Sequence, residues 1–153
     1  MKINIPKIIL PVSMTDYAPE LDGQFLQVWV NPPKSKLQEY DDLVTELQAR
    51  ELESARTTLF PADETKEAES SGLLKTFEML KHWLHIKAQK KPVGIDEKLL
   101  CWYAEMWSQG SEETRWTVAE LRLLEDQDPA FLSWMIRKTW ETRADHIQRK
   151  KKV

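Results

Sequence analysis

Few residues in this sequence combine types and spacing that could perform chemistry. His82 and His85 are three positions apart, which would place two imidazoles on one side of a helix, where they could share a metal ion. The pair lacks the glutamate of the zinc-protease motif, and the third histidine, His146, is distant in the sequence. Because structural zinc sites usually have four ligands, we expect no metal. A metal-dependent enzyme built on this pair is the third of three functional hypotheses.

The remaining candidates for catalysis fit structural roles better. Adjacent acids on a helix point apart and acids in a linker are hydrated, so we expect solvated carboxylates at Asp41–Asp42, Asp63–Glu64 and Glu112–Glu113. The only cysteine, Cys101, lies in an apolar helical run, which predicts a buried and unreactive thiol. None of the four glycines belongs to a phosphate-binding loop. We therefore predict that the protein is not an enzyme and has no cofactor.

Tryptophan is the most unusual feature of the composition. Six of the seven tryptophans lie in the second half of the chain, at Trp83, Trp102, Trp107, Trp116, Trp134 and Trp140. Each indole can bury about 150–250 Å², and tryptophan is enriched at binding hot spots. The surplus therefore predicts a surface that binds another protein. Helical phase places Trp107 and Trp140 in the core and leaves Trp102, Trp116 and Trp134 as the predicted partner-binding residues.

The 153 residues are most naturally one domain overall. Residues 1–34 are predicted to form an N-terminal β element, a small hairpin with strands at residues 3–12 and 24–31. The second strand is rich in β-branched and aromatic residues and is stopped by Pro32 and Pro33. Pro6 and Pro11 confine the first strand to a sheet edge or break it.

The apolar period becomes helical from Ser35 onward. Residues 35–56 are predicted to form an acidic helix that Ser35 can cap, because Leu37, Tyr40, Val44 and Leu47 recur at helical spacing. Residues 57–72 are predicted to be a flexible linker, because they combine acids with proline, serine and glycine.

Residues 73–153 are predicted to form a C-terminal helical region. The helices expected there span residues 73–90, 96–109, 117–125 and 128–149. A capping box at Thr117 and Glu120 marks one helix start, and Asp128 followed by Pro129 marks another. The predicted fold class is therefore mainly α (α+β), a helical domain of about five helices with a small N-terminal β-hairpin.

Charge and composition limit the classes of partner. The net charge of −3 is too small to indicate a global nucleic-acid or membrane partner, and no apolar run approaches the length of a membrane span. We expect a cytoplasmic protein. The C-terminal run from Gln148 to Val153 is basic and the first helix is acidic, so self-association steered by charge is possible.

The order of these parts resembles the tail assembly chaperones of long-tailed bacteriophages and prophages. The resembling pieces are the strand from Phe25 to Pro32, the acidic helix from Lys36, the segment from Trp116 to Leu121, and the segment from Asp128 to Trp134. The resemblance implies a chaperone that binds the tape-measure protein, or another tail component, in the bacterial host cytoplasm. It would prevent aggregation of that protein during tail assembly, and it is absent from the finished tail. No motif of the family assigns individual contact residues to this chain.

The second hypothesis is a helical nucleic-acid-binding regulator that uses the 117–149 helix pair and the basic C-terminus. A short helix, a tight turn and a longer helix resemble a helix-turn-helix outline. The turn is acidic where phosphates would lie, and the carboxylates of Glu120, Glu125, Asp126 and Asp128 would repel them, so the sequence disfavours nucleic acid as a partner.

Overall fold

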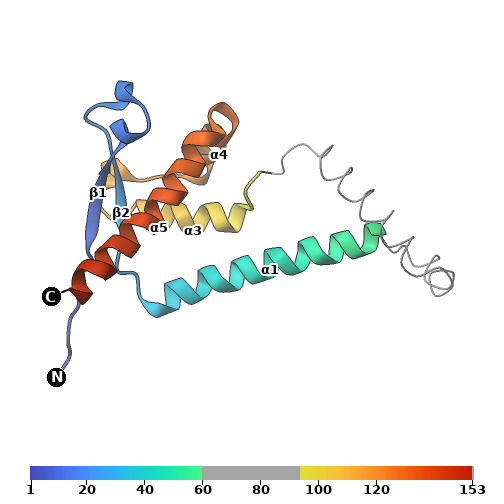
Figure 1. The fold of residues 1–153 in the computed structure, drawn as a ribbon, viewed down its shortest axis with the longest axis horizontal. Helices are drawn as coiled ribbons and strands as arrows, with labels where there is room; N and C mark the ends of the chain where they lie inside the picture. Colours follow the sequence, from blue (N-terminus) through green and yellow to red (C-terminus); the bar gives the residue numbers. More distant parts are fainter. Residues whose placement is uncertain (60–93, 153) are drawn as a thin grey trace. The chain divides into compact units, whose positions relative to one another are not determined.

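The computed structural model of the chain describes residues 1–59 and 94–152. The described part contains four α-helices and one two-stranded antiparallel sheet (Figure 1). The prediction of a mainly helical protein with a small N-terminal β-hairpin is confirmed. About five helices were predicted, and the one expected at residues 73–90 lies outside the described residues. The chain divides into two compact units, Met1–Tyr40 together with Ile95–Val153, and Asp41–Gly94.

The hairpin consists of β1 (Ile9–Ser13) and β2 (Phe25–Trp29), paired in a register that runs from Ile9 opposite Trp29 to Ser13 opposite Phe25. Alternation along β2 places Leu26 and Val28 fully inside, whereas Phe25 is 51% exposed. The first strand begins at Ile9, where residue 3 was predicted, and it ends one residue beyond the predicted 3–12. The connection between the strands carries two 3-10 turns, η1 (Met14–Asp16) and η2 (Pro19–Leu21).

Pro11 lies at a position of β1 where the sheet needs no backbone N–H donor, so proline breaks no hydrogen bond of the ladder. The amide of Val30 donates to the carbonyl of Ile8 and the amide of Met14 donates to the carbonyl of Gln24, each at 3.0 Å. Ladder bonds in β1 are therefore made by the even-numbered residues, and position 11 faces away from β2. Proline at this outward position also discourages another strand from adding to β1.

The acidic helix is α1 (Lys34–Leu59), which begins one residue before and ends three residues after the predicted 35–56. Thr57 and Thr58 are helical, although the flexible linker was predicted to start at residue 57. Their hydroxyls donate to the carbonyls of Glu53 and Ser54 at 2.8 Å, which satisfies both polar groups within the helix. The rest of the predicted linker lies outside the described residues.

Three helices follow: α3 (Glu97–Trp107), α4 (Val118–Gln127) and α5 (Pro129–Lys151), with a 3-10 turn η4 (Glu112–Thr114) before α4. The predicted capping box is present, because the Thr117 hydroxyl accepts from the Glu120 amide and the Glu120 carboxylate accepts from the Thr117 amide. α4 continues to Gln127, two residues beyond the predicted end at residue 125, so a single residue, Asp128, separates it from α5. That residue ends α4 and caps α5.

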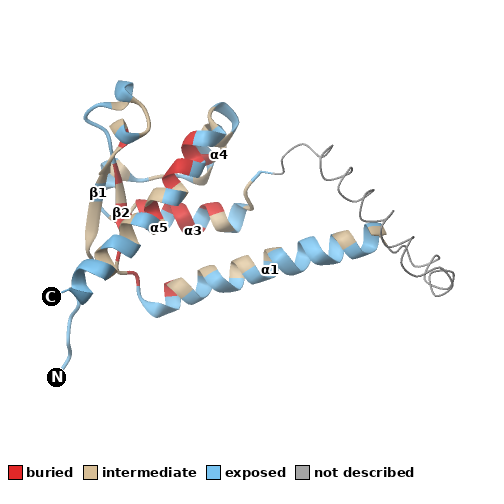
Figure 2. Cartoon of the chain, in the orientation of Figure 1, coloured by how far each residue is buried: buried red, intermediate tan, exposed pale blue. Residues whose placement is uncertain are grey.

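The core forms around α3, which contacts both β2 and α4. Figure 2 shows buried residues gathered on α3, α5 and β2. Six of the eleven residues of α3 are buried: Leu100, Trp102, Tyr103, Ala104, Met106 and Trp107. These residues surround most of the helix, because a helix that is covered on several sides is apolar over most of its circumference. α5 lies against β1, β2 and α4 and closes the core.

Substitution of Asp128 tests how much its hydrogen bonds contribute to the stability of the fold. Its Oδ1 accepts from the Phe131 amide at 3.2 Å, and both carboxylate oxygens accept from the Tyr17 hydroxyl at 3.0 Å. We expect Asp128→Ala to lower the free energy of unfolding by about 2 kcal/mol, since it removes a cap and a charged hydrogen bond. Urea unfolding measures this loss.

Two matched variants separate the contributions. Tyr17→Phe removes only the hydroxyl, and Asp128→Asn keeps a capping oxygen, so each should lose less stability than Asp128→Ala. An Asp128→Ala protein within about 0.5 kcal/mol of the parent would contradict the prediction, because that is the size of an ordinary surface substitution.

Candidate functional site

Trp102, the first predicted partner-binding residue, is buried, with 2% of its surface exposed. Its indole N–H donates to the carbonyl of Lys36 at 2.9 Å. Its ring lies 4.7 Å from the ring of Tyr40 and stacks on Trp140 at 5.8 Å. The expectation that helical phase leaves this ring accessible is wrong, because residues of α1 and α5 cover the side of α3 that carries it.

Trp134, the second, is also buried, at 5% exposed. Phe131 stacks against it at 5.8 Å, and Tyr17 lies 5.7 Å away on the connection between the two strands. The expected exposure is again wrong, because a loop distant in sequence covers this face of α5. Helical periodicity within α5 holds no information about that loop.

Trp116, the third, is half-buried and packs edge to face against Trp107 at 6.4 Å. It alone of the three predicted partner-binding residues is not buried. Through Trp107 it belongs to the same aromatic cluster as Trp102, whereas Trp134 lies in a separate cluster with Tyr17 and Phe131. The three side chains therefore do not form one surface.

The two tryptophans predicted to be core are placed by hydrogen bonds as well as by packing. Trp107 is fully buried, and its indole N–H donates to the Thr139 hydroxyl at 2.8 Å. Trp140 is half-buried, and its indole N–H donates to the Tyr103 hydroxyl at 2.9 Å. A buried indole needs a partner for its N–H, and these two partners fix the rotation of α3 against α5.

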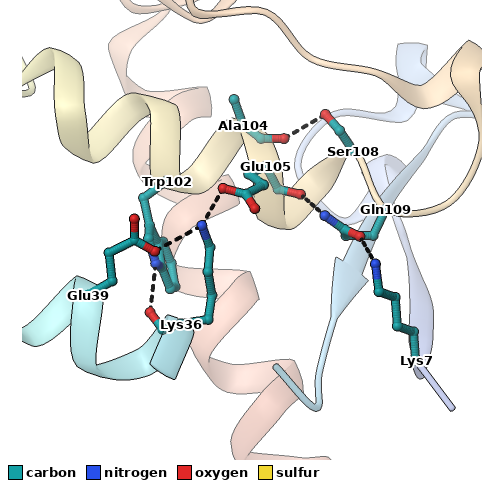
Figure 3. Close-up of polar contacts among 8 residues, drawn as sticks. All are labelled: Lys7, Lys36, Glu39, Trp102, Ala104, Glu105, Ser108 and Gln109. Atoms are coloured by element: carbon teal, nitrogen blue, oxygen red, sulfur yellow. Dashed lines mark hydrogen bonds and ion pairs between the residues drawn. The ribbon is translucent and has the colours of Figure 1, made fainter. Parts of the chain in front are cut away.

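Lys36 forms a polar link that sequence reasoning missed. Its ammonium pairs with the carboxylate of Glu105, and with that of Glu39 at 3.1 Å (Figure 3). Burial lowers the pKa of Lys36, but the hydrogen bonds and charges of Glu105 and Glu39 outweigh it, so the pKa lies above its ordinary value. The sequence did not single out Lys36, because other charged residues lie near it at the start of this amphipathic helix.

A second polar link holds the segment before β1 against the end of α3. The Lys7 ammonium donates to Gln109 Oε1 at 2.6 Å, and Gln109 Nε2 donates to the carbonyl of Glu105 at 3.0 Å (Figure 3). The same ammonium lies 4.8 Å from the centre of the Trp29 ring, a cation–π contact. Both links join elements of the unit formed by residues 1–40 and 95–153. Their polar groups bind one another, which gives them a structural role.

Cys101 is exposed, which corrects the prediction of a buried thiol. It lies four residues after Glu97 and four before Glu105, and therefore on the polar side of α3. That spacing was readable in the sequence and was overlooked because the neighbours in the chain are apolar. Within residues 1–59 and 94–152, no three histidine, cysteine or acidic side chains are grouped so that they could hold a metal ion. His82 and His85 lie outside those ranges.

Exposed apolar side chains give the remaining candidate for a binding surface. Large apolar side chains of high exposure occur at Met1, Ile3, Ile5, Phe25, Leu52 and Leu123. Leu52 on α1 is 73% exposed, and the half-buried Ala55 and Leu59 follow it at i+3 and i+7. These three residues, which we call the α1 strip, share one face of the helix. Their spacing is that of the anchors by which amphipathic helices bind each other.

None of the helices in the described part of the chain has the length and apolar character needed to cross a membrane. No protein-family model, curated protein or solved structure matches this chain.

The Trp107–Thr139 hydrogen bond can be tested directly. We expect Thr139→Val to lower the free energy of unfolding by about 1–3 kcal/mol, because it leaves a buried indole N–H without an acceptor. Thr139→Ser keeps the acceptor and removes one methyl group, so it should cost about 1 kcal/mol or less. Chemical denaturation measures both, and equal stability of Thr139→Val and the parent would contradict the assigned bond.

The raised pKa of Tyr103 predicts that the protein loses stability at alkaline pH. Burial, then the hydrogen bond with Tyr40, raises the pKa of Tyr103 far above its ordinary value, against a smaller lowering by Trp140. Above about pH 10 the unfolded tyrosine ionises while the folded one stays neutral. The unfolded state then binds fewer protons, so the free energy of unfolding falls by up to about 1.4 kcal/mol per pH unit.

The Tyr103→Phe variant isolates this contribution, because it should reduce the slope of stability against pH above about pH 10. Lys36 adds to the alkaline loss in both proteins, since its raised pKa means that its stabilisation is present below about pH 10.5 and is lost above it. Urea unfolding at several pH values gives both slopes. An unchanged slope in Tyr103→Phe would show that Tyr103 ionises equally in both states.

Proposed function

We propose that this chain is a phage tail assembly chaperone, which binds the tape-measure protein and prevents its aggregation while the tail is assembled in the bacterial cytoplasm. The first support is the resemblance carried by the strand from Phe25, the acidic helix from Lys36 and the Thr117 and Asp128 helix starts. A tape-measure protein exposes long apolar helical faces before the tail tube forms around it, and such faces aggregate. A chaperone for it must offer apolar surface of matching geometry.

The observation that carries the proposal is the α1 strip. Leu52 is 73% exposed, and Ala55 and Leu59 extend its line along the helix. Covering a leucine side chain contributes about 1.5–3 kcal/mol, so one such contact is weak. Several copies bound along a single long chain would gain from high effective concentration. Weak, repeated binding also suits a chaperone that is released when assembly is complete.

This assignment moves the proposed binding surface away from the tryptophans. Trp102 and Trp134 are buried in the unit formed by residues 1–40 and 95–153, at 2% and 5% exposed, so their rings stabilise the fold. Trp116 retains some accessible surface and stays a secondary candidate for partner contact.

The alternative, a nucleic-acid-binding regulator, has weaker support. α4 and α5 are joined by Asp128 alone, and Glu125 and Asp126 lie in the last turn of α4. These carboxylates would repel phosphates at the junction. The basic residues Arg149, Lys150 and Lys151 lie in the last turn of α5, where cations stabilise the negative end of the helix dipole. Strong, salt-dependent binding to duplex DNA would favour this alternative.

Co-expression tests the proposal. The tape-measure gene of the same genome is expressed in bacteria with and without the gene for this chain, and the soluble fraction of the tape-measure protein is measured. We expect the chain to raise that fraction and to co-purify with it. Leu52→Glu should weaken binding by about ten- to a hundredfold, because it removes one buried leucine from the interface.

Leu123→Glu is the matched control, since Leu123 is another leucine of high exposure, at 57%, but lies on α4. It should bind like the parent. A tape-measure protein that stays equally insoluble with and without the chain would overturn the proposed function. Equal loss of binding in the two variants would overturn the α1 strip as the surface.

A further inference from the structure

We propose that the α1 strip binds an amphipathic helix whose apolar face is flanked by lysine or arginine. This inference rests on the proposed function and names the chemistry of the partner at that surface. It follows from the charges of α1 beyond Tyr40, where five carboxylates and two arginines occur between residues 41 and 59. The helix therefore presents a net negative surface around its apolar positions.

Three of these carboxylates have no ion-pair partner within the described residues: Asp41, Glu51 and Glu53. All three residues are exposed. Glu46, by contrast, pairs with Arg50 at 2.5 Å along the same helix. Positive charges on a partner could therefore pair with these three carboxylates, which form no ion pair with a described lysine or arginine.

The positions of these acids relative to Leu52 favour a helix as the partner. Successive residues of a helix are about 100° apart around its axis, so Glu51 and Glu53 lie on either side of the line through Leu52. Asp41 precedes Leu52 by eleven residues, close to three whole turns, and lies in nearly the same line. Charges that flank an apolar strip on both sides are those that select partner and orientation when two helices pack side by side.

Other chemistries fit this surface less well. A helix flanked by acids would place like charges together, which is unfavourable. An apolar partner without cations would remove water from Glu51 and Glu53 without replacing their hydrogen bonds, which is costly. An anionic membrane surface would repel the same carboxylates. A basic-flanked helix both covers Leu52 and neutralises its neighbours.

Two synthetic helical peptides test the inference with the full chain. Both carry the same leucines at i, i+3 and i+7 along one face, and the residues flanking that face are lysine in one and glutamate in the other. Affinity is measured by calorimetry at about 50 mM and about 500 mM salt. We expect the lysine-flanked peptide to bind about tenfold more tightly at low salt, with the difference shrinking at high salt.

Charge reversal on the protein completes the test. Asp41→Lys, Glu51→Lys and Glu53→Lys combined should invert the preference, and lysine is a good helix former, so α1 should persist by circular dichroism. The control reverses three other exposed acids, Glu20, Glu112 and Glu113, and makes the same change in net charge. It should keep the parent's preference.

Three results would overturn the inference: equal affinity for the two peptides, binding of neither, or inversion of the preference by the control as well. None of these decides the proposed function, which depends on the co-expression result. A chain that keeps the tape-measure protein in solution but does not distinguish the peptides is a chaperone with a different partner chemistry.

Discussion

The hydrogen bond from the Trp107 indole to the Thr139 hydroxyl fixes how α3 and α5 meet. Both side chains are almost completely inaccessible, and the Thr139 hydroxyl also donates to the carbonyl of Met135 at 2.8 Å. The indole N–H groups of Trp102 and Trp140 likewise donate to acceptors inside the protein, the carbonyl of Lys36 and the hydroxyl of Tyr103. Large indoles supply the apolar area of this small core, and their N–H groups specify one arrangement of the helices, because a buried donor tolerates few positions. The abundance of tryptophan thus has a structural explanation for these rings.

Sequence reasoning succeeded where the signal is local. The Thr117 capping box and the Asp128-Pro129 start depend on residues three or fewer positions apart, and both are present as predicted. The hairpin and the long acidic helix were likewise readable from short-range periodicity. It failed where burial depends on distant segments: Trp102 is covered by Lys36 and Tyr40, and Trp134 by Tyr17. Cys101 could have been placed correctly, because its partners at i−4 and i+4 are both glutamates.

The candidate binding surface was harder to foresee for a related reason. Leu52 follows the regular stripe of the first half of α1 by a spacing of five, so it lies off the line of Val44 and Leu47. Its exposure, at 73%, distinguishes it from those half-buried residues only once the helix is seen in three dimensions. An exposed leucine on a largely charged helix gains no stability from burial, and the proposed recognition of another chain would give this side chain a role.

The junction between α4 and α5 limits how this sequence can change over evolution. Asp128 closes one helix and opens the next with no intervening residue, and its carboxylate simultaneously receives the Tyr17 hydroxyl. If even one amino acid were inserted or deleted there, a single residue could no longer end α4, cap α5 and accept the Tyr17 hydrogen bond. The connection between β1 and β2 has its ends joined by the sheet, so its residues after Tyr17 can vary in length at little entropic cost. Descendants of this gene should therefore drift in that connection while keeping the spacing around Asp128 constant.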